Sequence, residues 1–486
     1  MVFKKTTDYL DSLINYEQKG LPYKSRTFKL SRVKKLLKTL NHPEKNFSVI
    51  HIAGTKGKGS TAAFAAYILR EAGLKVGLYT SPHLFSRRER IRILKPNVSK
   101  SKLCSDLEGC ISEKSLNIAI SDILEKAKEE SIIAKKRISF FEFFTILAFY
   151  YFAQQKIDVA VVEVGLGGRL DATNVLDSDI CGITPIGLEH TEQLGNSILE
   201  IAQEKAAIIK NQTKMVVVSP QKKQALDAIK KQAQKTNTPI LVAGKDFTYK
   251  LLEVDIKKQT FCLSMKKKKD IVLCTQLLGS HQIVNASVAA VMVQYFLSES
   301  FKNIAGDLSK NISCLNSRLK LQTRAEHLSI IHSTTENLEK YIVDGIKNTC
   351  WPARFEILSK RPFVVVDSAH TKDSAQKLVE AVRSIFPKQK VILVLGASRD
   401  KDVRGICSEL KSIAKEIILT KSKHPRAFLF SQDFSKKLFS DKEIVIEPNA
   451  KTALAQALSR ARKRDVVLVA GSVFLAAEIR RQLIKG

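Results

Sequence analysis

No long hydrophobic stretch occurs in this sequence. The longest apolar run is Phe143–Ala153, interrupted by Thr145 and bounded by Glu142 and Gln154. This run is far shorter than the roughly 20 residues that a membrane-spanning helix needs. The first residues of the chain contain no apolar segment typical of a secretory signal. We therefore expect a cytoplasmic protein with no membrane partner.

The cysteines also lack any metal-binding spacing. All eight are scattered, and no C-x-x-C pair occurs among them. This distribution argues against a zinc ribbon or a disulfide framework and is typical of reduced cytosolic thiols. With 44% apolar and 26% charged residues, the composition is that of a soluble globular protein. A length of 486 residues exceeds one ordinary core and predicts two or three domains.

Acidic residues are scarce relative to basic ones. The chain has 80 Lys and Arg against 48 Asp and Glu, a formal net charge of +32. Such a charge suits nucleic acid, an acidic small substrate or simply a lysine-rich proteome. The lysines are spread along the chain, with one dense cluster at Lys266–Lys269, and no arginine-rich tail or aromatic-interleaved basic stripe occurs. We expect no specific nucleic-acid partner.

Short apolar strands alternate with helical stretches, which predicts an α/β fold. The first series has predicted helices at Ser60–Ala72 and Phe140–Ala153, and segment 247–278 is expected to form antiparallel strands. Its other predicted strands are Phe47–Ala53, Val76–Tyr79, Val159–Val164, Cys181–Thr184, Val216–Ser219 and Ile240–Val242.

A second series begins after Trp351-Pro352. Its predicted strands are Phe363–Asp367, Val391–Gly396, Glu416–Thr420, Glu443–Ile446 and Val466–Ala470. Residues 298–349 between the two series are polar and contain few motifs. We therefore predict one domain at 1–349 and a second at 350–486.

A glycine-rich loop follows the first predicted strand. It reads Gly54-Thr55-Lys56-Gly57-Lys58-Gly59-Ser60-Thr61 and leads into a helix. Glycines let backbone N–H groups approach a phosphate, the helix N-terminus supplies positive potential and Lys58 adds a charge. The common phosphate-loop pattern has Ser or Thr directly after the lysine, whereas Gly59 intervenes here. The alternative is a simple glycine-rich turn, but the strand and helix around it favour nucleotide binding.

Four further segments follow this loop in order. They are Tyr79–Leu84 (YTSPHL), Val161–Asn174 (VVEVGLGGRLDATN), Gly187–Gly195 (GLEHTEQLG) and Gln203–Ala206 (QEKA). Together with GTKGKGS they resemble the folylpolyglutamate synthase/dihydrofolate synthase branch of the Mur ligase superfamily, over nearly the whole chain. The resemblance implies a P-loop ATPase-type N-terminal Mur ligase domain with a small antiparallel β region, followed by a smaller Rossmann-like domain. It also implies a monomer.

The resemblance implies an ATP-dependent, amide-forming ligase. A carboxylate is activated as an acyl phosphate and then attacked by the amine of L-glutamate. The acceptor is dihydropteroate, a tetrahydrofolate (poly)glutamate, or both. The RLDATN version resembles bacterial members, many of which use both acceptors, so we expect a bifunctional enzyme. A positive surface would help to gather such acidic substrates.

The resemblance also assigns residues to the nucleotide and to metal. ATP is expected to contact Thr55, Lys56, Gly57, Lys58, Gly59, Ser60, Asn285, Arg354, Asp367 and His370. One or two magnesium ions are expected on Ser81, Glu163, His190 and Lys205, with Lys205 carried as a carbamate. Lys58, His190 and Lys205 are the expected catalytic residues. Taken alone, His190 would be read as a hydrogen-bonded loop residue and Lys205 as an ordinary helical surface lysine.

The pterin substrate is expected on two segments. The resemblance places it against Ser139, Phe141, Leu170, Asp171 and Ala172. An aromatic ring such as Phe141 can stack on a flat pterin. The alternative is that Phe140, Phe141, Phe143 and Phe144 belong to the core, which we expect for most of them.

The sequence departs from the family pattern in the second domain. Ala353 replaces a glycine, and Thr371-Lys372 replaces Asn-Pro after His370. Segment 300–345 is also longer than in most members. Because Arg354 and Asp367 lie in the second domain and the loop in the first, we expect domain closure to complete the site and exclude water.

Two alternatives remain from the sequence alone. One is a ligase that joins an amino acid to another acid, which the GKGS loop and GLGGRLDATN argue against. The other is a basic, nucleotide-regulated binding protein without ligase activity. The joint presence of Ser81, Glu163, His190 and Lys205 argues against that loss.

Overall fold

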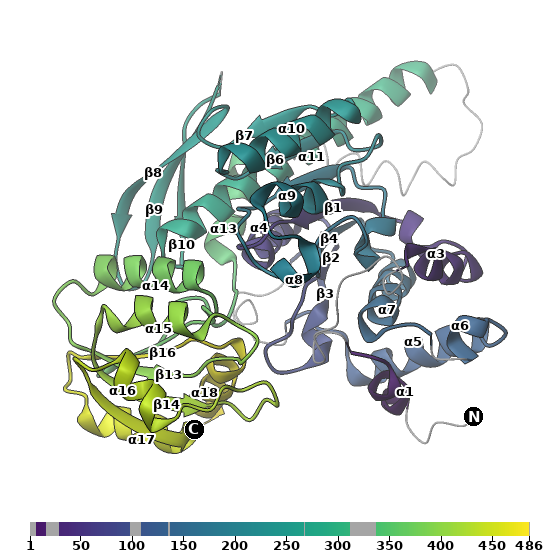
Figure 1. The fold of residues 1–486 in the computed structure, drawn as a ribbon. Coiled ribbons are helices and arrows are strands. Elements are labelled where there is room, and N and C mark those ends of the chain that lie inside the picture. The colour runs from purple at the N-terminus through teal and green to yellow at the C-terminus, as the bar shows by residue number, and fades with distance from the viewer. Residues whose placement is uncertain are drawn as a thin grey trace.

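The computed structural model describes residues 6–15, 29–97, 108–134, 137–266, 268–311 and 337–485. Two α/β domains, each built on a mainly parallel sheet, lie side by side (Figure 1). Within the described ranges, no helix is both long and apolar enough to cross a membrane. The fold class predicted from the alternating pattern is confirmed.

A seven-stranded sheet forms the centre of the first domain, in the order β3-β2-β4-β1-β5-β6-β7. Its strands pair in parallel except for β3, which runs antiparallel to β2. The strands are β1 (Ser48–Ala53), β2 (Val76–Tyr79), β3 (Ile91–Leu94), β4 (Val159–Glu163), β5 (Ile180–Ile183), β6 (Met215–Val218) and β7 (Ile240–Val242). The predicted strands are thus present, and β3 is an additional one.

Helices cover both faces of this sheet. The helices are α1 (Thr6–Ser12), α3 (Leu30–Thr39), α4 (Lys58–Glu71), α5 (Glu113–Lys126), α6 (Ser131–Ala134), α7 (Phe140–Gln154), α8 (Thr191–Leu194), α9 (Ile198–Ala206), α10 (Lys223–Lys235), α11 (Ser280–Asn311) and α13 (Leu338–Asn348). Alternate residues of β1 divide between the faces, with Ile50 and Ile52 towards α4 and α11 and Val49 towards α7. This alternation is what a strand buried on both sides requires.

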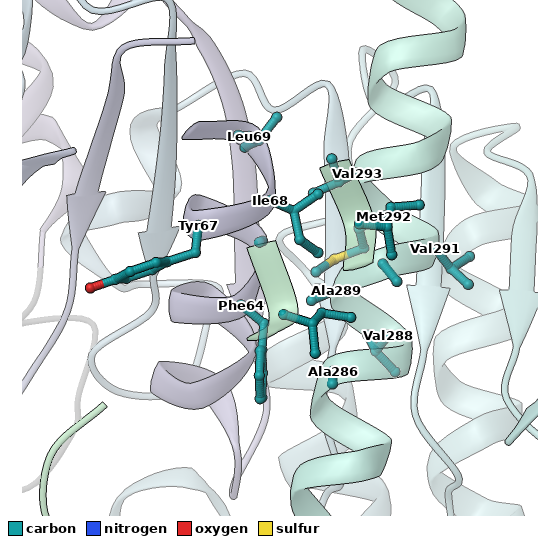
Figure 2. Packing of buried hydrophobic residues seen from close by; sticks show 14 of the residues in the cluster. Phe64, Tyr67, Ile68, Leu69, Ala286, Val288, Ala289, Val291, Met292 and Val293 are labelled. Carbon is teal, nitrogen blue, oxygen red and sulfur yellow. The ribbon is translucent and has the colours of Figure 1, made fainter. Parts of the chain in front are cut away.

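Helices α4 and α11 pack closely against each other beneath the sheet (Figure 2). Phe64 and Ile68 of α4 lie opposite Ala289, Met292 and Val293 of α11. All five side chains are fully buried. Burying each of the four larger side chains contributes about 1.5–3 kcal/mol, so the interface fixes α4 firmly in place.

A small antiparallel sheet follows, as predicted for segment 247–278. It has the order β10-β9-β8, with β8 (Phe247–Val254), β9 (Gln259–Met265) and β10 (Ile271–Thr275). Its inner face packs on the core formed with α11 and α13. The lysine-rich cluster joins β9 to β10, and residue 267 in it lies outside the described residues.

The second domain contains a six-stranded sheet in the order β11-β12-β16-β13-β14-β15. Only the edge strand β11 is antiparallel to its neighbour. The strands are β11 (Glu356–Lys360), β12 (Phe363–Val366), β13 (Val391–Leu395), β14 (Ala414–Lys421), β15 (Glu443–Asn449) and β16 (Val466–Ala470). Five of these are the predicted strands, and β11 is additional.

Helices α14 (Lys372–Ile385), α15 (Val403–Lys411) and α16 (Gln432–Leu438) pack on one face of this sheet. Helices α17 (Ala450–Arg460) and α18 (Val473–Lys485) pack on the other. We propose the domain boundary at residues 349/350, because α13 still packs on the first core and β11 opens the second sheet. Of the long segment 300–345, residues 312–336 lie outside the described residues.

Candidate active site

A cavity of about 1680 Å³ lies between the two domains. Eighteen of the nineteen residues that the sequence assigned to the site line it. They are Thr55, Lys56, Gly57, Lys58, Gly59, Ser60, Ser81, Ser139, Phe141, Glu163, Leu170, Asp171, Ala172, His190, Asn285, Arg354, Asp367 and His370. The remaining one, Lys205, lies beneath the phosphate loop.

The phosphate loop depends on its glycines. Gly54 and Gly57 have φ values of +148° and +84°. A Cβ on Gly54 would overlap the Thr184 side chain, and one on Gly57 would overlap the Asn285 amide. The loop therefore needs glycine at both positions for backbone conformation and for space. Helix α4 begins at Lys58, two residues earlier than predicted, which places this lysine in the first turn of the helix.

Backbone hydrogen bonds hold the loop against the chain that follows β5. The N–H groups of Thr55 and Lys56 both donate to the Pro185 carbonyl, at 2.9 and 3.2 Å. The loop is thus fixed to the end of a neighbouring parallel strand. Ligands of open α/β sheets bind at this edge, beyond the carboxyl ends of the strands.

Glu163 ends β4 at the same edge. Its Oε2 accepts a hydrogen bond from the Ser81 backbone N–H at 3.0 Å, and the side chain is buried. Burial raises the pKa of the Glu163 carboxyl, against the opposing effects of the Lys58 charge and the Ser81 N–H. A divalent cation would add positive charge beside this buried carboxylate.

His190 precedes α8 with a left-handed backbone, φ 54°. Burial lowers the pKa of His190 to about 4; the nearby Glu189 carboxylate opposes this shift, while Lys401 adds to it. The imidazole is therefore neutral at neutral pH, the form that can bind a metal ion. No trio of His, Cys, Asp or Glu side chains gathers in a metal-binding arrangement in the part of the chain that the structure describes.

Lys205, expected from sequence alone to be a surface lysine, is buried near the end of α9. Its Nζ donates to the Gly54 carbonyl at 2.8 Å, and among described residues no carboxylate forms an ion pair with it. Burial and then the Lys58 charge lower the pKa of Lys205 to about 7. The backbone approaches closely here because Gly168 packs on α9, where a Cβ would overlap the Glu204 carbonyl.

Both predicted pterin segments line the cavity. Ser139 caps α7 in a reciprocal pair with Glu142. The Phe141 ring lies against Gly165, where any Cβ would overlap it. Phe140, Phe143 and Phe144 are buried in the core, so the expectation for these three is confirmed. Phe141 itself is only partly buried and borders the cavity.

The Asp171 carboxylate shapes the turn on which the other pterin residues lie. It accepts hydrogen bonds from the backbone N–H groups of Thr173, at 3.0 Å, and Leu166, at 2.8 Å. Both oxygens are therefore engaged inside the protein. This geometry gives Asp171 a structural part in the site, holding Leu170 and Ala172 at the cavity wall.

The second domain brings charged groups to the opposite wall. Asp367 follows β12 and accepts from the N–H groups of Phe355 and Ala369, both at 2.7 Å. Arg354 donates to the Ser368 hydroxyl. Burial lowers the pKa of Arg354, while Asp367 and Glu163 oppose that shift, so the guanidinium lies near carboxylates of both domains.

The two departures from the family pattern have different structural consequences. Ala353 adopts φ 54°, a left-handed conformation that glycine reaches without strain, and its side chain is buried. Thr371 caps α14 by accepting from the Ser374 N–H at 3.3 Å, and Lys372 opens the helix. The helix start is therefore intact without proline. His370 is held by its Nδ1, 2.8 Å from the Ser368 carbonyl.

Sequence reasoning missed several cavity residues, among them Glu189, Lys401 and Trp351. Glu189 lies in the GLEHTEQLG segment, but no role was predicted for it from the sequence. Lys401 follows β13, and its position after a parallel strand was the available signal. Trp351 contacts the phosphate loop, since a Cβ on Gly59 would lie 3.1 Å from its ring.

Comparisons with known proteins agree with this geometry. The Mur ligase middle domain model matches residues 118–293, and the Mur ligase, glutamate ligase domain model matches residues 353–473. The two-domain fold with its phosphate loop at the interdomain cavity is thus that of a Mur-type ligase. The chain belongs to the folylpolyglutamate synthase/dihydrofolate synthase branch of the Mur ligase superfamily.

Two relatives and one solved structure illustrate the likeness. The dihydrofolate synthase/folylpolyglutamate synthase of Bacillus subtilis is 29% identical, covering 93% of this chain and 94% of the relative. A probable bifunctional folylpolyglutamate synthase/dihydropteroate synthase of Halobacterium salinarum is 31% identical, but this chain spans only 48% of its length and 92% of its own. The Mycobacterium tuberculosis folylpolyglutamate synthase complexed with ADP and AMPPCP is 26% identical, with a TM-score of 0.75 over 94% of this chain and 96% of that one.

Proposed function

We propose that this protein is an ATP-dependent ligase that joins L-glutamate to a folate substrate through an amide bond. The observation that carries the proposal is a single cavity that combines three groups: the phosphate-loop Lys58, the buried carboxylate of Glu163 and the second-domain Arg354. Phosphoryl transfer to a carboxylate requires charged groups of this kind on both sides of the transferring phosphoryl group. The names of the relatives support the same substrate class.

The reaction has two balanced steps. A substrate carboxylate oxygen attacks the γ-phosphorus of ATP, forming an acyl phosphate and releasing ADP. The amine of glutamate then attacks the acyl carbon, the amide bond forms, and inorganic phosphate and a proton leave. Lys58, in the first turn of α4, lies where it can neutralise charge on the transferring phosphoryl oxygens. Arg354 lines the same cavity from the second domain, so it can add a second positive charge to that group.

The residues at the strand ends fit a magnesium ion. Ser81 and Glu163 offer hard oxygen ligands and His190 a neutral imidazole, and magnesium keeps several waters of its own. When bound, magnesium neutralises phosphate charge and orients the nucleotide. We infer that one or two ions use these side chains. The raised pKa of the Glu163 carboxyl, caused by burial, fits a position that a cation completes.

We also propose that Lys205 is carbamylated. Its amine adds to the carbon of CO₂, and the nitrogen loses a proton, giving a carboxylate. The buried side chain has no carboxylate partner among described residues and points at Gly54 of the loop. Protein incubated with ¹³C-bicarbonate should show one carbamate resonance that is absent from the Lys205→Met variant. A spectrum without that resonance would contradict the proposal.

We propose further that both dihydropteroate and a tetrahydrofolate glutamate are accepted. The cavity has an aromatic wall at Phe141 for a pterin, and Arg354 and Lys377 on its second-domain side offer positive charge for an acidic tail. The test measures ADP release with magnesium and glutamate, comparing the two acceptors. Turnover with both supports bifunctionality, and turnover with tetrahydrofolate alone makes the enzyme a tail-extending synthase. Silence with both, despite ATP binding, would overturn the folate assignment.

We propose a monomer located in the cytoplasm, without a nucleic-acid partner. Light scattering on the eluted peak of a size-exclusion column tests the oligomeric state, and a dimer mass would contradict it.

A further inference from the structure

One carboxylate in the cavity contacts charged side chains from both domains. Oε2 of Glu189 accepts a hydrogen bond from Nζ of Lys56, in the phosphate loop, at 2.8 Å. Oε1 of Glu189 accepts from Nζ of Lys401, in the second domain, at 3.3 Å. The same oxygen lies 3.9 Å from Nε2 of His370, also in the second domain. Glu189 thus joins the loop to the opposite wall of the cavity.

These side chains are largely withdrawn from solvent. The side chain of Glu189 is 13% exposed, that of Lys401 15% and that of Lys56 27%. Salt screens an exposed ion pair strongly but a buried one much less. Removing one member of a buried pair leaves an uncompensated charge, which is strongly unfavourable. The Glu189 link is therefore energetically significant, unlike a surface ion pair.

The backbone that carries Glu189 is fixed against both domains. The Gly187 N–H donates to the Thr55 hydroxyl at 3.1 Å, and the same hydroxyl lies 3.2 Å from the Gly187 carbonyl. On its other side Gly187 meets α14, where an added Cβ would lie 3.0 Å from the Asp373 carboxylate. The chain two residues before Glu189 is therefore close to both the phosphate loop and the second domain.

The surrounding charges explain why a carboxylate is placed here. Lys56, Lys58 and Lys401 all line the cavity and would repel one another without an anion between them. A polyphosphate supplies that anion only when it is bound. Before then, Glu189 is the carboxylate within ion-pair distance of lysines from both domains.

We propose that Glu189 is a positioning residue that holds the second domain onto the phosphate loop through Lys401 and orients Lys56 towards the nucleotide. The nucleotide then meets a closed, preassembled set of cations, and its binding does not have to supply the whole cost of closure. This inference rests on the nucleotide-binding part of the proposed function. It assigns Glu189 no contact with the substrate.

The test uses three variants of the full chain: Glu189→Gln, Lys401→Met and the double variant. Small-angle scattering of the nucleotide-free proteins measures the radius of gyration. Calorimetry with magnesium and AMPPCP measures nucleotide affinity. Each single variant should expand the protein and raise the dissociation constant of the analogue about tenfold, within the usual range of coupling between sites. The double variant should bind the analogue no more weakly than the weaker-binding single variant, because both substitutions break the same link.

Two further variants serve as controls. Lys214→Met removes the partner of Asp179 in a more exposed ion pair, at 2.9 Å, and should behave as the wild type. Glu189→Asp keeps the charge and should recover part of the affinity. If Glu189→Gln does not fold, Lys401→Met breaks the link from its other end and supports the same measurements.

Three results would overturn the inference. They are additive effects in the double variant, an unchanged radius of gyration in both single variants, and tighter analogue binding by Glu189→Gln. If the wild type does not bind the analogue at all, the proposed function fails, and scattering alone still decides whether Glu189 holds the domains together.

Discussion

Nζ of Lys205, on α9, donates a hydrogen bond to the carbonyl of Gly54, the first residue of the phosphate loop. These residues lie 151 positions apart in the sequence, and their contact ties α9 to the phosphate loop. A Cβ on Gly54 would overlap the Thr184 side chain, so Lys205 contacts the loop at this residue through its backbone alone. Substitutions in the loop should therefore affect chemistry and local packing to different degrees.

Lys58→Met should slow ligation strongly while leaving the fold intact. Loss of one preorganised charge in a phosphoryl-transfer site costs about 10²- to 10³-fold in kcat. The measurement is ADP release at saturating ATP, with melting temperature as the check on folding. Lys235→Met, on the exposed end of α10, is the matched control and should retain full activity. Equal activity of the two variants would exclude Lys58 from the reaction.

Gly57→Ala should weaken nucleotide binding strongly, because its Cβ would overlap Asn285 and because φ is +84°. Gly244 has the same φ of +84° with nothing within 4 Å of an added Cβ. Gly244→Ala thus reports the backbone strain alone, about 1–2 kcal/mol. Calorimetric titration with an ATP analogue should show loss of binding only for Gly57→Ala. Similar affinities in both variants would mean that the Asn285 contact is unimportant.

Ala353→Gly should change the free energy of unfolding by less than about 1 kcal/mol. Relief of left-handed strain is offset by the lost burial of a methyl group and the greater freedom of the unfolded chain. Ala353→Val should destabilise by about 2–3 kcal/mol, because a β-branched residue tolerates φ 54° poorly. Urea denaturation measures both. A tolerated valine would show that this segment can adjust its backbone.

Acid should destabilise the protein partly through His51. Burial and then the Lys210 charge lower the pKa of His51 to about 3, from 6.5 in the unfolded chain. Below pH 6.5 the unfolded state binds a proton that the folded state does not bind. Stability is therefore lost as pH falls from about 6.5 towards 3, by up to roughly 1.4 kcal/mol per pH unit.

The His51→Gln variant should lack this part of the pH dependence. Its urea unfolding curves between pH 5 and 8 should have a shallower slope of stability against pH than the wild type. The comparison isolates His51, since its Nε2 lies 2.8 Å from the Thr173 hydroxyl and its Nδ1 has no partner among the described residues. Parallel slopes for the two proteins would contradict the assignment.

Much of the fold follows from local sequence patterns. The buried strands β1, β4 and β13 were predictable because uninterrupted apolar runs between helical stretches indicate strands covered on both faces. Strand β3 was not, since its four residues include Arg92 and directly follow the charged segment Arg87–Arg90. Strand β11 is only half-buried and reads as a polar segment. Both strands lie at sheet edges, where the apolar sequence pattern that indicates a strand is weakest.

The site was predictable where motifs are local and unpredictable where the fold supplies the partner. The phosphate loop, Glu163 and His190 lie in recognisable segments of the first domain. The contact of Glu189 with Lys401 joins residues 212 positions apart and depends on how two domains meet. The burial of Lys205 could not be predicted either, because the local sequence of a helical turn that contains lysine does not distinguish a buried turn from an exposed one.

Helix α4 has a consequence for engineering. All eleven residues from Ser60 to Arg70 are buried, so the phosphate loop begins a helix that lies inside the protein. A phosphate loop transferred to another protein would need the buried residues that pack around α4 to be transferred with it. A transplantable unit therefore has to include β1, α4 and the segments of α11 and α13 that pack on α4, and loop swaps between members of the superfamily should succeed only as such a block.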